Sequence, residues 1–356
     1  MRLDKKTISK QTLGTNAMGR LCLKYNISLA IIAIAANFLL ASCGSVKTGL
    51  QSPEQLIFRS NDYIVYKLQT RDTWAALAEK YLGDEGKYWM IQDANENRPL
   101  KTGTFIHIPL KDRNRGGLSI AGYQKVPILC YHRFAEKCAS PLCMPVHLFE
   151  QQMKFLKEND YHTISTEALL DFLNYRHSIP KKSVIISIDD GYRSVYNLAY
   201  PILKKYGFTA TLFIYTDYVG VSSKSITWPQ LAEMKAAGFC IGSHTIAHSD
   251  LSKKSDSESE SVYLKRVHRE LVLSKEIIDR KLAQNTFVLA YPFGRYTRQV
   301  REMTKAAGYR LAMTVKRGGN PFFTNPHTLN REQVLKRDMP TFISYLKVLS
   351  ARTKDR

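Results

Sequence analysis

The strongest constraint on the fold is a short apolar run at residues 184–188 that ends directly in Asp189, Asp190 and Gly191. The run is rich in β-branched residues and is bounded by lysines and glycine, which predicts a buried strand. Adjacent strand residues point to opposite sides, so the two carboxylates diverge while the strand stays regular. Gly191 permits a sharp turn, so both carboxylates can reach one site at the end of the strand.

A second apolar run, residues 239–243, ends at His244, and His248 follows four residues later. A separation of four places two side chains on one side of a helical turn, close enough to share a metal ion. Alone, Asp-Asp-Gly is more often a turn and His-x3-His a surface helix. At the ends of two strands, however, one of the two aspartates and the two histidines form the three-ligand set of a catalytic metal site. With the other aspartate left for acid–base work, the pattern predicts a metal-dependent hydrolase.

Strands and helices alternate through the larger, C-terminal part of the chain, which we assign to residues 123–356. This alternation predicts an α/β domain built as a (β/α) barrel, in which sites lie at the carboxyl ends of the strands. A polar segment at 252–261 leads into an amphipathic helix. Its apolar face is formed by Val267, Leu271, Ile278 and Leu282.

Several segments resemble the motifs of the polysaccharide deacetylases, the nodulation-deacetylase homology domain of the carbohydrate esterases. Ser-Ile-Asp-Asp-Gly at 187–191 and His-Thr-Ile-Ala-His at 244–248 are similar to the first two motifs, and Ala-Tyr-Pro-Phe-Gly at 290–294 to the third. Residues 126–134 resemble the opening strand of the exopolysaccharide-type branch, and 329–331 resemble the closing strand. The resemblance implies an irregular barrel of seven or eight strands.

The resemblance also implies the roles of individual residues. Asp190, His244 and His248 would hold a divalent metal, most often Zn²⁺, and Asp189 would be the general base that deprotonates the attacking water. The backbone N–H of Phe293 would help to stabilise the tetrahedral oxyanion. The activity implied is that of a polysaccharide N-deacetylase, a hydrolase acting on carbon–nitrogen bonds other than peptide bonds.

The residue that acts as general acid is harder to assign. The family's closing strand usually carries a histidine for this role, whereas this strand reads Leu329-Asn330-Arg331. The exopolysaccharide-type branch resembles a circularly shifted version in which the first strand carries the acid, so His132 is our candidate. The alternative is a core histidine bonded to a backbone carbonyl. His327 is a second, weaker candidate.

Two further positions depart from the family pattern. Ala290 stands where the family often has an arginine that pairs with the base aspartate. Without that partner Asp189 would keep a higher pKa, and Arg331, at a predicted strand end, is our candidate to replace it. No clear counterpart of the fourth, tryptophan-bearing motif is found, and we interpret Trp228 as core packing.

The N-terminal segment resembles an export signal. Basic residues precede an apolar run at 27–40, followed by Leu-Ala-Ser and Cys43. The run is shorter than the roughly 20 apolar residues of a spanning helix, and Leu-Ala-Ser-Cys resembles the bacterial lipoprotein box. We therefore predict a signal peptide at 1–42, lipidation of Cys43 and a tether at 43–61; an uncleaved anchor is the alternative. Gly44 lacks the aspartate typical of inner-membrane retention, which favours a periplasm-facing, outer-membrane location over the inner membrane.

A small module is predicted at 62–110, followed by a linker at 111–122. Asp72 and Thr73 can cap a helix along which apolar residues from Trp74 onward recur at helical spacing, and a strand–helix–helix–strand order follows. The pattern resembles a LysM module, a small α+β fold whose family binds N-acetylglucosamine-containing glycans. Arg71 stands where a glycine is usual. A spacer that binds nothing is the alternative.

Charge and cysteine content fit export. The net charge of +21 suits anionic envelope surfaces or a solvated face, and nucleic acid is not an expected partner of an exported protein. Cys138 and Cys143 flank a short loop, where an oxidising compartment makes a disulfide plausible. Cys130 and Cys240 fall in predicted strands and are interpreted as small apolar fillers.

Three functions remain open from the sequence. The first is removal of N-acetyl groups from N-acetylhexosamine glycans at the envelope, the second is an O-acetyl polysaccharide esterase, and the third is an inactive glycan-binding lipoprotein. The presence of all four residues, Asp189, Asp190, His244 and His248, argues against the third. The LysM-like module favours peptidoglycan and the opening strand favours an exopolysaccharide; we place peptidoglycan first.

Overall fold

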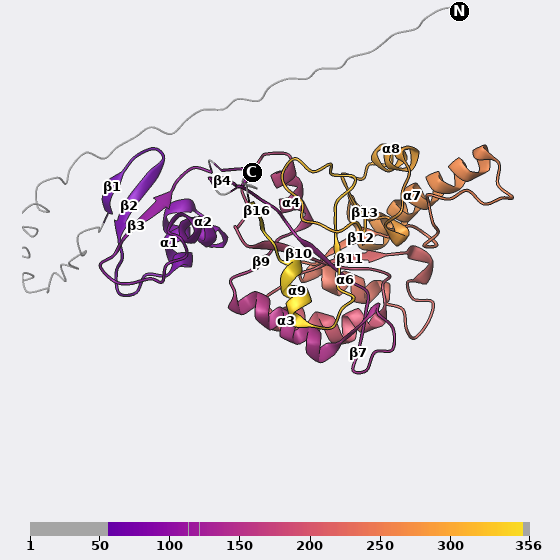
Figure 1. Cartoon of the computed structure of the whole chain (residues 1–356), viewed down its shortest axis with the longest axis horizontal. Coiled ribbons are helices and arrows are strands. Elements are labelled where there is room, and N and C mark those ends of the chain that lie inside the picture. The colour runs from indigo at the N-terminus through magenta and orange to yellow at the C-terminus, as the bar shows by residue number, and fades with distance from the viewer. Residues whose placement is uncertain (1–55, 113, 121, 352–356) are drawn as a thin grey trace, which may run out of the picture. The chain divides into compact units, whose positions relative to one another are not determined.

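The computed structural model describes residues 56–112, 114–120 and 122–351 (Figure 1). The predicted signal peptide, the lipidation site Cys43 and most of the predicted tether lie outside the described residues. No helix within the described ranges has the length and apolar character needed to cross a membrane.

The first described part is a three-stranded antiparallel sheet, in the order β1-β2-β3, with two helices. Its elements are β1 (Leu56–Arg59), β2 (Tyr63–Lys67), α1 (Trp74–Leu82), η1 (Glu85–Lys87), α2 (Tyr88–Ala94) and β3 (Phe105–Pro109). Thr73 caps α1 by accepting a hydrogen bond from the Ala76 amide, and Gly83 ends the helix with a φ of 66°. The expected strand–helix–helix–strand order is present, and β1 adds a strand from within the segment predicted as tether.

The second part is a parallel barrel. Along its main path the described strands are β14 (Leu311–Met313), β13 (Val288–Ala290), β12 (Cys240–Ser243), β11 (Thr211–Ile214), β10 (Ser183–Ile188), β6 (Ile128–Tyr131) and β15 (Glu332–Gln333), and β9 (His162–Thr163) pairs with the start of β10. Leu329, just before β15, forms a parallel bridge with Met313 of β14. The ring is thus closed by one short segment, and the predicted irregular barrel is confirmed.

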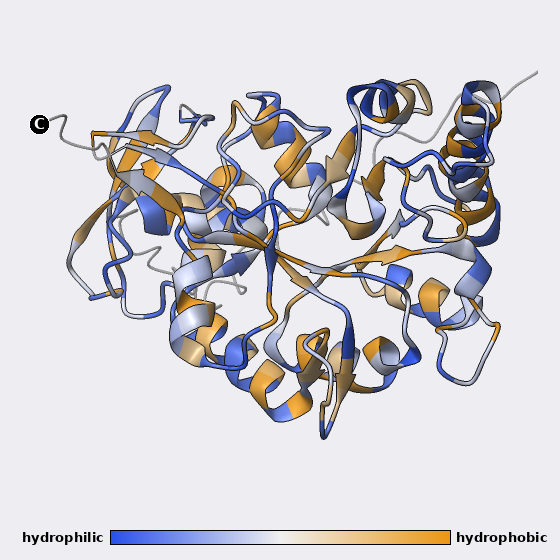
Figure 2. Cartoon of the chain, turned by 45° about the vertical axis from the view of Figure 1, so that its right-hand side comes forward, coloured by the Kyte–Doolittle hydropathy of each residue, from blue (hydrophilic) through white to orange (hydrophobic). Residues whose placement is uncertain are grey.

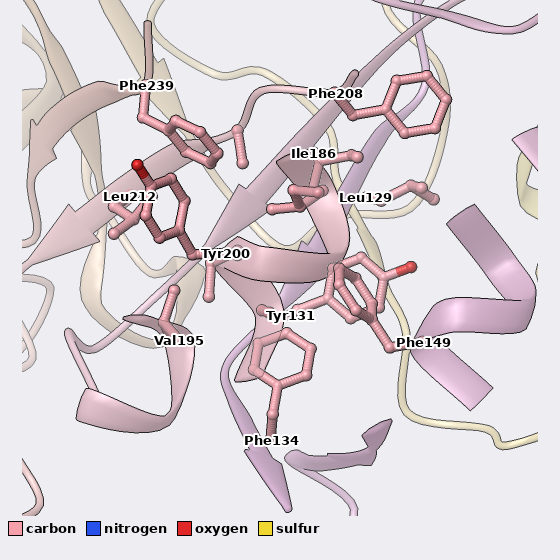
Figure 3. Close-up of a cluster of buried hydrophobic side chains, with 14 of the residues drawn as sticks. Leu129, Tyr131, Phe134, Phe149, Ile186, Val195, Tyr200, Phe208, Leu212 and Phe239 are labelled. Carbon is pink, nitrogen blue, oxygen red and sulfur yellow. The ribbon is translucent and has the colours of Figure 1, made fainter. Parts of the chain in front are cut away.

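The barrel strands are apolar because both of their faces are covered (Figure 2). Every residue of β10 is buried, and side chains from β6, β10 and β11 pack with those of the surrounding helices in the cluster drawn in Figure 3. Packing is tight enough to require glycine at one position of β12. A Cβ on Gly242 would lie 2.7 Å from the Phe213 ring.

Helices cover the outside of the barrel. They are α3 (Val146–Glu158), α4 (Thr166–Leu173), η2 (Val195–Ala199), α5 (Tyr200–Tyr206), α6 (Trp228–Ala236), α7 (Glu260–Leu282), α8 (Arg298–Ala306) and α9 (Met339–Tyr345). Two short helices, η3 (Thr216–Tyr218) and η4 (Pro292–Gly294), follow the ends of β11 and β13 instead. The predicted apolar face of α7 is buried, from Val267 to Leu282. Trp228, the first residue of α6, packs against the core as expected.

Two small sheets complete the fold. β4 (Leu118–Ser119), β5 (Gly122–Gln124) and β16 (Leu349–Ala351) form one, and β7 (Arg133–Ala135) and β8 (Cys143–Pro145) form the other. β4 therefore falls inside the segment predicted as a linker. A disulfide joins Cys138 to Cys143 across the loop between β7 and β8, as proposed from the sequence.

Candidate active site

The two aspartates at the carboxyl end of β10 separate because the chain leaves the extended conformation at Asp190. Asp190 and Gly191 both have a φ of 74°, so the sharp turn begins one residue earlier than the glycine. Asp189 continues the line of the strand and Asp190 is turned away from it. Both carboxylates nevertheless approach His244, with Asp189 Oδ2 and Asp190 Oδ1 lying 3.9 and 3.7 Å from its Nε2 atom.

The two histidines lie on a loop that follows β12, not on a helical turn as predicted. Thr245 and His248 have φ values of 71° and 57°, which a right-handed helix excludes. Groups outside the motif bond to this loop: Glu270 of α7 accepts hydrogen bonds from the amides of Ile246 and Ala247, at 2.8 and 3.1 Å from its Oε2 atom. The amides of Thr216 and Asp217 donate to the carbonyls of Thr245 and Ile246. The imidazole rings still meet, with centroids 4.7 Å apart.

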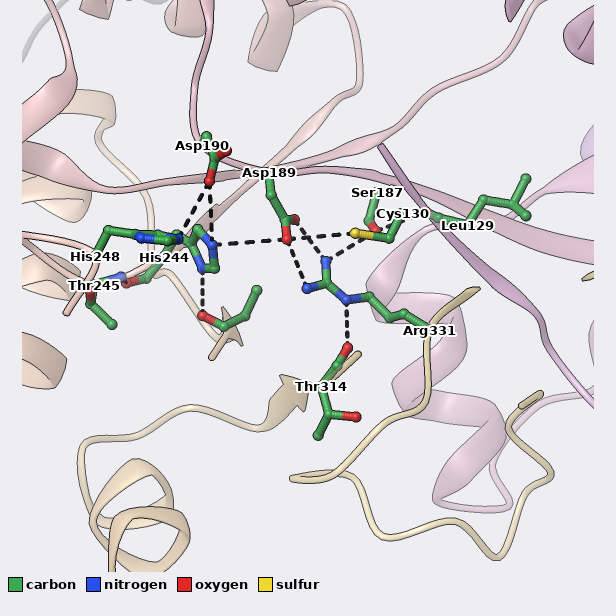
Figure 4. A network of polar contacts seen from close by, with 12 residues as sticks. Leu129, Cys130, Ser187, Asp189, Asp190, His244, Thr245, His248, Thr314 and Arg331 are labelled. Atoms are coloured by element: carbon green, nitrogen blue, oxygen red, sulfur yellow. Dashed lines mark hydrogen bonds and ion pairs between the residues drawn. The ribbon is translucent and has the colours of Figure 1, made fainter. Parts of the chain in front are cut away.

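Asp190, His244 and His248 form a compact group of potential ligands (Figure 4). Their ligand atoms lie within 4.8 Å of one another, and the Nε2 of His248 is 3.5 Å from Asp190 Oδ1. The Nδ1 of His244 lies 2.7 Å from the carbonyl oxygen of Ala290, which fixes the proton on Nδ1 and turns the Nε2 lone pair toward the group.

The protonation of this group suits a cation. Burial lowers the pKa of His244 to about 4 and also lowers that of His248, so both rings are neutral at neutral pH. Burial and the charge of Asp189 raise the pKa of Asp190 to about 7. Two neutral imidazoles and a carboxylate are the donors that zinc accepts in catalytic sites, so these residues fit a divalent metal.

Asp189 is paired with Arg331. The family often supplies this partner as an arginine at the position that Ala290 occupies here. The guanidinium Nη1 and Nη2 donate to Asp189 Oδ1 and Oδ2 at 2.7 and 2.8 Å, and Nε donates to the carbonyl of Thr314 at 2.8 Å. Arg331 is 0% exposed. Burial alone would raise the pKa of Asp189, but the Arg331 charge outweighs it and holds that pKa well below its ordinary value.

His132 lies beside Asp189, directly after β6. A nitrogen of its ring, the sulfur of Cys130 and a carboxylate oxygen of Asp189 lie within 4.8 Å of one another. Within the described ranges, its ring makes no hydrogen bond to a backbone carbonyl, which the alternative of a core histidine required. The ring of His327, the second candidate, is bonded to another residue: its Nε2 lies 2.8 Å from the carbonyl oxygen of Tyr309.

The comparisons agree with this geometry. A family model described as polysaccharide deacetylase matches residues 176–312. The YxkH protein of Bacillus subtilis (strain 168), which is named for the same family, is 32% identical over 210 residues, covering 59% of this chain and 71% of that protein. The chain belongs to the polysaccharide deacetylase family. The expectation of a deacetylase hydrolase is thereby confirmed.

Two further proteins are similar to this deacetylase. The solved structure of the Streptococcus pyogenes deacetylase PplD in complex with acetate has a TM-score of 0.58 and 30% identity, covering 63% of this chain and 98% of that one. The poly-beta-1,6-N-acetyl-D-glucosamine N-deacetylase of Staphylococcus aureus (strain MRSA252) is 31% identical over 175 residues. That match covers 47% of this chain and 59% of the relative, which is less than two thirds of its length.

The third motif of the deacetylase borders the ligand group. Phe293 lies in η4 with a φ of 58°, and its ring centroid is 4.7 Å from that of His248. Gly294, with a φ of 69°, is required here, since a Cβ would lie 2.4 Å from the Val315 side chain. The motif is therefore a tight left-handed turn next to the histidines, and the oxyanion role of the Phe293 amide remains a prediction.

Two buried residues near the site were missed by sequence reasoning. Glu270, which holds the histidine loop, gives no local signal because it lies in the middle of α7. Cys130 was interpreted as a filler, but its Sγ lies 3.6 Å from Asp189 Oδ2. Burial raises the pKa of the Cys130 thiol well above its ordinary value, so the thiol stays protonated and can donate to the carboxylate.

Proposed function

We propose that this deacetylase removes N-acetyl groups from N-acetylhexosamine residues of a bacterial envelope glycan, with Zn²⁺ held by Asp190, His244 and His248. The observation that carries the proposal is the juxtaposition of this neutral-imidazole and carboxylate group with a second carboxylate, Asp189, kept ionised by Arg331. The named activity of the Staphylococcus aureus relative supports an N-acetyl substrate.

The chain's own residues supply the remaining chemistry. A bound divalent cation supplies Lewis acidity and lowers the pKa of water toward about 7. Asp189 accepts a proton from the water as its oxygen attacks the acetamide carbonyl carbon. The Phe293 N–H donates to the oxyanion that forms. The carbon–nitrogen bond then breaks, His132 donates a proton to the leaving nitrogen, and the products are acetate and a free amine.

The module ahead of the barrel is proposed to bind glycan, as its LysM-like pattern implies. A hollow of about 200 Å³ in this module is lined by Leu68, Trp74 and Phe105 together with the polar residues Asn95 and Arg98. An aromatic surface beside a few polar groups suits a sugar ring. Peptidoglycan stays our first prediction for the polymer, and poly-β-1,6-N-acetylglucosamine, the substrate in the relative's name, is the second.

The location is proposed to be the outer membrane, facing the periplasm, through a lipid on Cys43. Each buried methylene contributes about 0.8 kcal/mol, and two or more acyl chains anchor stably. Metabolic labelling with a fatty acid should mark the wild-type chain and leave Cys43→Ser unmarked. Equal labelling of both chains would contradict lipidation at this residue.

The activity is tested by acetate release from three substrates: N-acetylglucosamine oligomers, purified peptidoglycan and an O-acetylated glycan. The full chain is assayed in detergent with and without chelator, beside Asp189→Asn. Metal-dependent release from the N-acetylated substrates, lost in the variant, is the expected result. Release from the O-acetylated glycan alone would replace the proposal with an esterase, and no release at all would leave a glycan-binding lipoprotein.

A further inference from the structure

Three tyrosines form a continuous row of aromatic rings that ends at the histidine loop. Tyr192 follows Gly191, and Tyr215 and Tyr218 follow β11. The ring centroids of Tyr192 and Tyr218 are 5.7 Å apart, those of Tyr218 and Tyr215 are 5.1 Å apart and stacked, and Tyr215 is 5.4 Å from His248. Phe293, 53% exposed, also lies against the His248 ring.

The hydroxyl groups of these tyrosines distinguish them from the tyrosines of the core. All three side chains are half-buried, and within the described ranges none of their hydroxyls has a hydrogen-bond partner. By contrast, the hydroxyls of Tyr131 and Tyr263 donate at 2.8 Å to Gln152 and to the carbonyl of Leu251. The hydroxyls of Tyr192, Tyr215 and Tyr218 reach solvent, so all three are accessible to a ligand that lies along the row.

We propose that Tyr192, Tyr215 and Tyr218 bind the sugar ring adjacent to the one whose acetamide is hydrolysed. A pyranose ring offers apolar C–H edges to aromatic side chains and hydroxyls to polar groups, and the tyrosine row presents both. The row is continuous with the metal-ligand group through Tyr215 and His248, so the occupant is a neighbouring residue of the same glycan chain. This inference rests on the proposed function and adds the residues that would contact the neighbouring sugar.

The kinetic test compares N-acetylglucosamine with its pentamer. We expect the wild type to prefer the pentamer and Tyr218→Ala to lose about tenfold in kcat/KM for the pentamer, mostly through KM, which corresponds to about 1.4 kcal/mol. Tyr192→Phe and Tyr215→Phe remove only hydroxyls and should show the same selective loss to a smaller degree. The matched control is Tyr175→Phe, a 49% exposed tyrosine between α4 and β10, at the opposite end of the strands.

A binding measurement separates this inference from the proposed function. Calorimetric titration of the zinc-loaded Asp189→Asn variant with pentamer should give an affinity about tenfold higher than that of the Asp189→Asn/Tyr218→Ala double variant. Equal affinities, or an unchanged pentamer preference in all three tyrosine variants, would overturn the tyrosine site. If the wild type releases no acetate while binding still depends on Tyr218, the deacetylation proposal fails and the sugar site stands.

Discussion

Asp189 and Asp190 are neighbours in the sequence but occupy opposite electrostatic environments. Asp189 accepts hydrogen bonds from two nitrogens of the buried Arg331, and the charge of Arg331 holds the pKa of Asp189 far below its ordinary value. Asp190 lies beside His244 and His248, and burial together with the Asp189 charge raises its pKa to about 7. Among the described residues, no lysine or arginine forms an ion pair with Asp190.

This contrast divides the site into two parts. The base side is Asp189 with its partner Arg331, and the ligand side is Asp190 with His244 and His248. The base side is electrostatically complete without any bound ion, because Arg331 compensates the charge of Asp189. The ligand side gathers a carboxylate and two lone pairs, with no cationic side chain paired to it among the described residues, and a divalent cation would complete it. The two sides should therefore respond differently when each is changed.

The largest expected effect comes from neutralising the two aspartates separately. Asp189→Asn removes the base and should lower kcat by about 10²- to 10⁴-fold while zinc still binds. Asp190→Asn removes a ligand and should lose zinc affinity together with activity. Acetate release and calorimetric zinc titration on both variants check this division. Loss of zinc binding in Asp189→Asn, with an intact thermal transition, would show that the two sides are not separate.

The next effect concerns Arg331. Replacing it with methionine leaves the Asp189 charge buried and unpaired, which costs about 3–5 kcal/mol in the free energy of unfolding. The double variant Arg331→Met/Asp189→Asn has no such charge and should regain a large part of that stability. Denaturant unfolding of the metal-free proteins measures both. If the double variant is no more stable than the single one, Arg331 acts through packing and its contact with Thr314, not through the Asp189 charge.

A smaller effect is expected at Glu270, which supports the ligand side from α7. Its Oε2 accepts both loop amides, and a glutamine can offer a carbonyl oxygen in the same place. Glu270→Gln should therefore bind zinc nearly as wild type does, whereas Glu270→Leu should lose about 10- to 100-fold in affinity, as is typical when an outer partner of metal ligands is removed. Equal zinc affinity in Glu270→Leu would mean that the loop keeps its left-handed residues without Glu270.

The same contrast explains which features were predictable from the sequence. The strands that deliver Asp189 and His244 were predictable, because their apolar runs and terminal glycine or polar residues are local signals. The loop conformation of residues 244–248 was not, because its amides are bonded to Glu270, a residue far along the chain. Closure of the barrel gives no comparable local signal, since β15 contains only two residues, Glu332 and Gln333. The closing segment at 329–331 was expected only from the family resemblance, and Leu329 does bridge to Met313.

The smallest expected effect, and the sharpest test of the contrast, is the pH dependence of stability without metal. The ordinary pKa of an aspartate is about 3.9, whereas Asp190 in the folded protein titrates at about 7. Between these values the folded state holds a proton that the unfolded state has lost, so this group's contribution to stability declines as pH rises from about 4 to about 7. His244 works in the opposite direction, since its folded pKa of about 4 lies below its ordinary value.

The titration of Asp190 is therefore isolated by comparing wild type with Asp190→Asn, both with chelator, by denaturant unfolding across this pH range. The stability of the wild type relative to the variant should fall as pH rises. Asp189→Asn serves as the contrasting variant, because the stabilisation by ionised Asp189 is lost only as pH falls below about 4. Above that pH, the pH dependence of its difference from wild type reflects the groups whose pKa values the Asp189 charge raises, which include Asp190, His244, His248 and His132. A flat wild-type-minus-Asp190→Asn difference from pH 4 to 7 would show that Asp190 is ionised without a metal, and that the ligand side is already compensated by the protein.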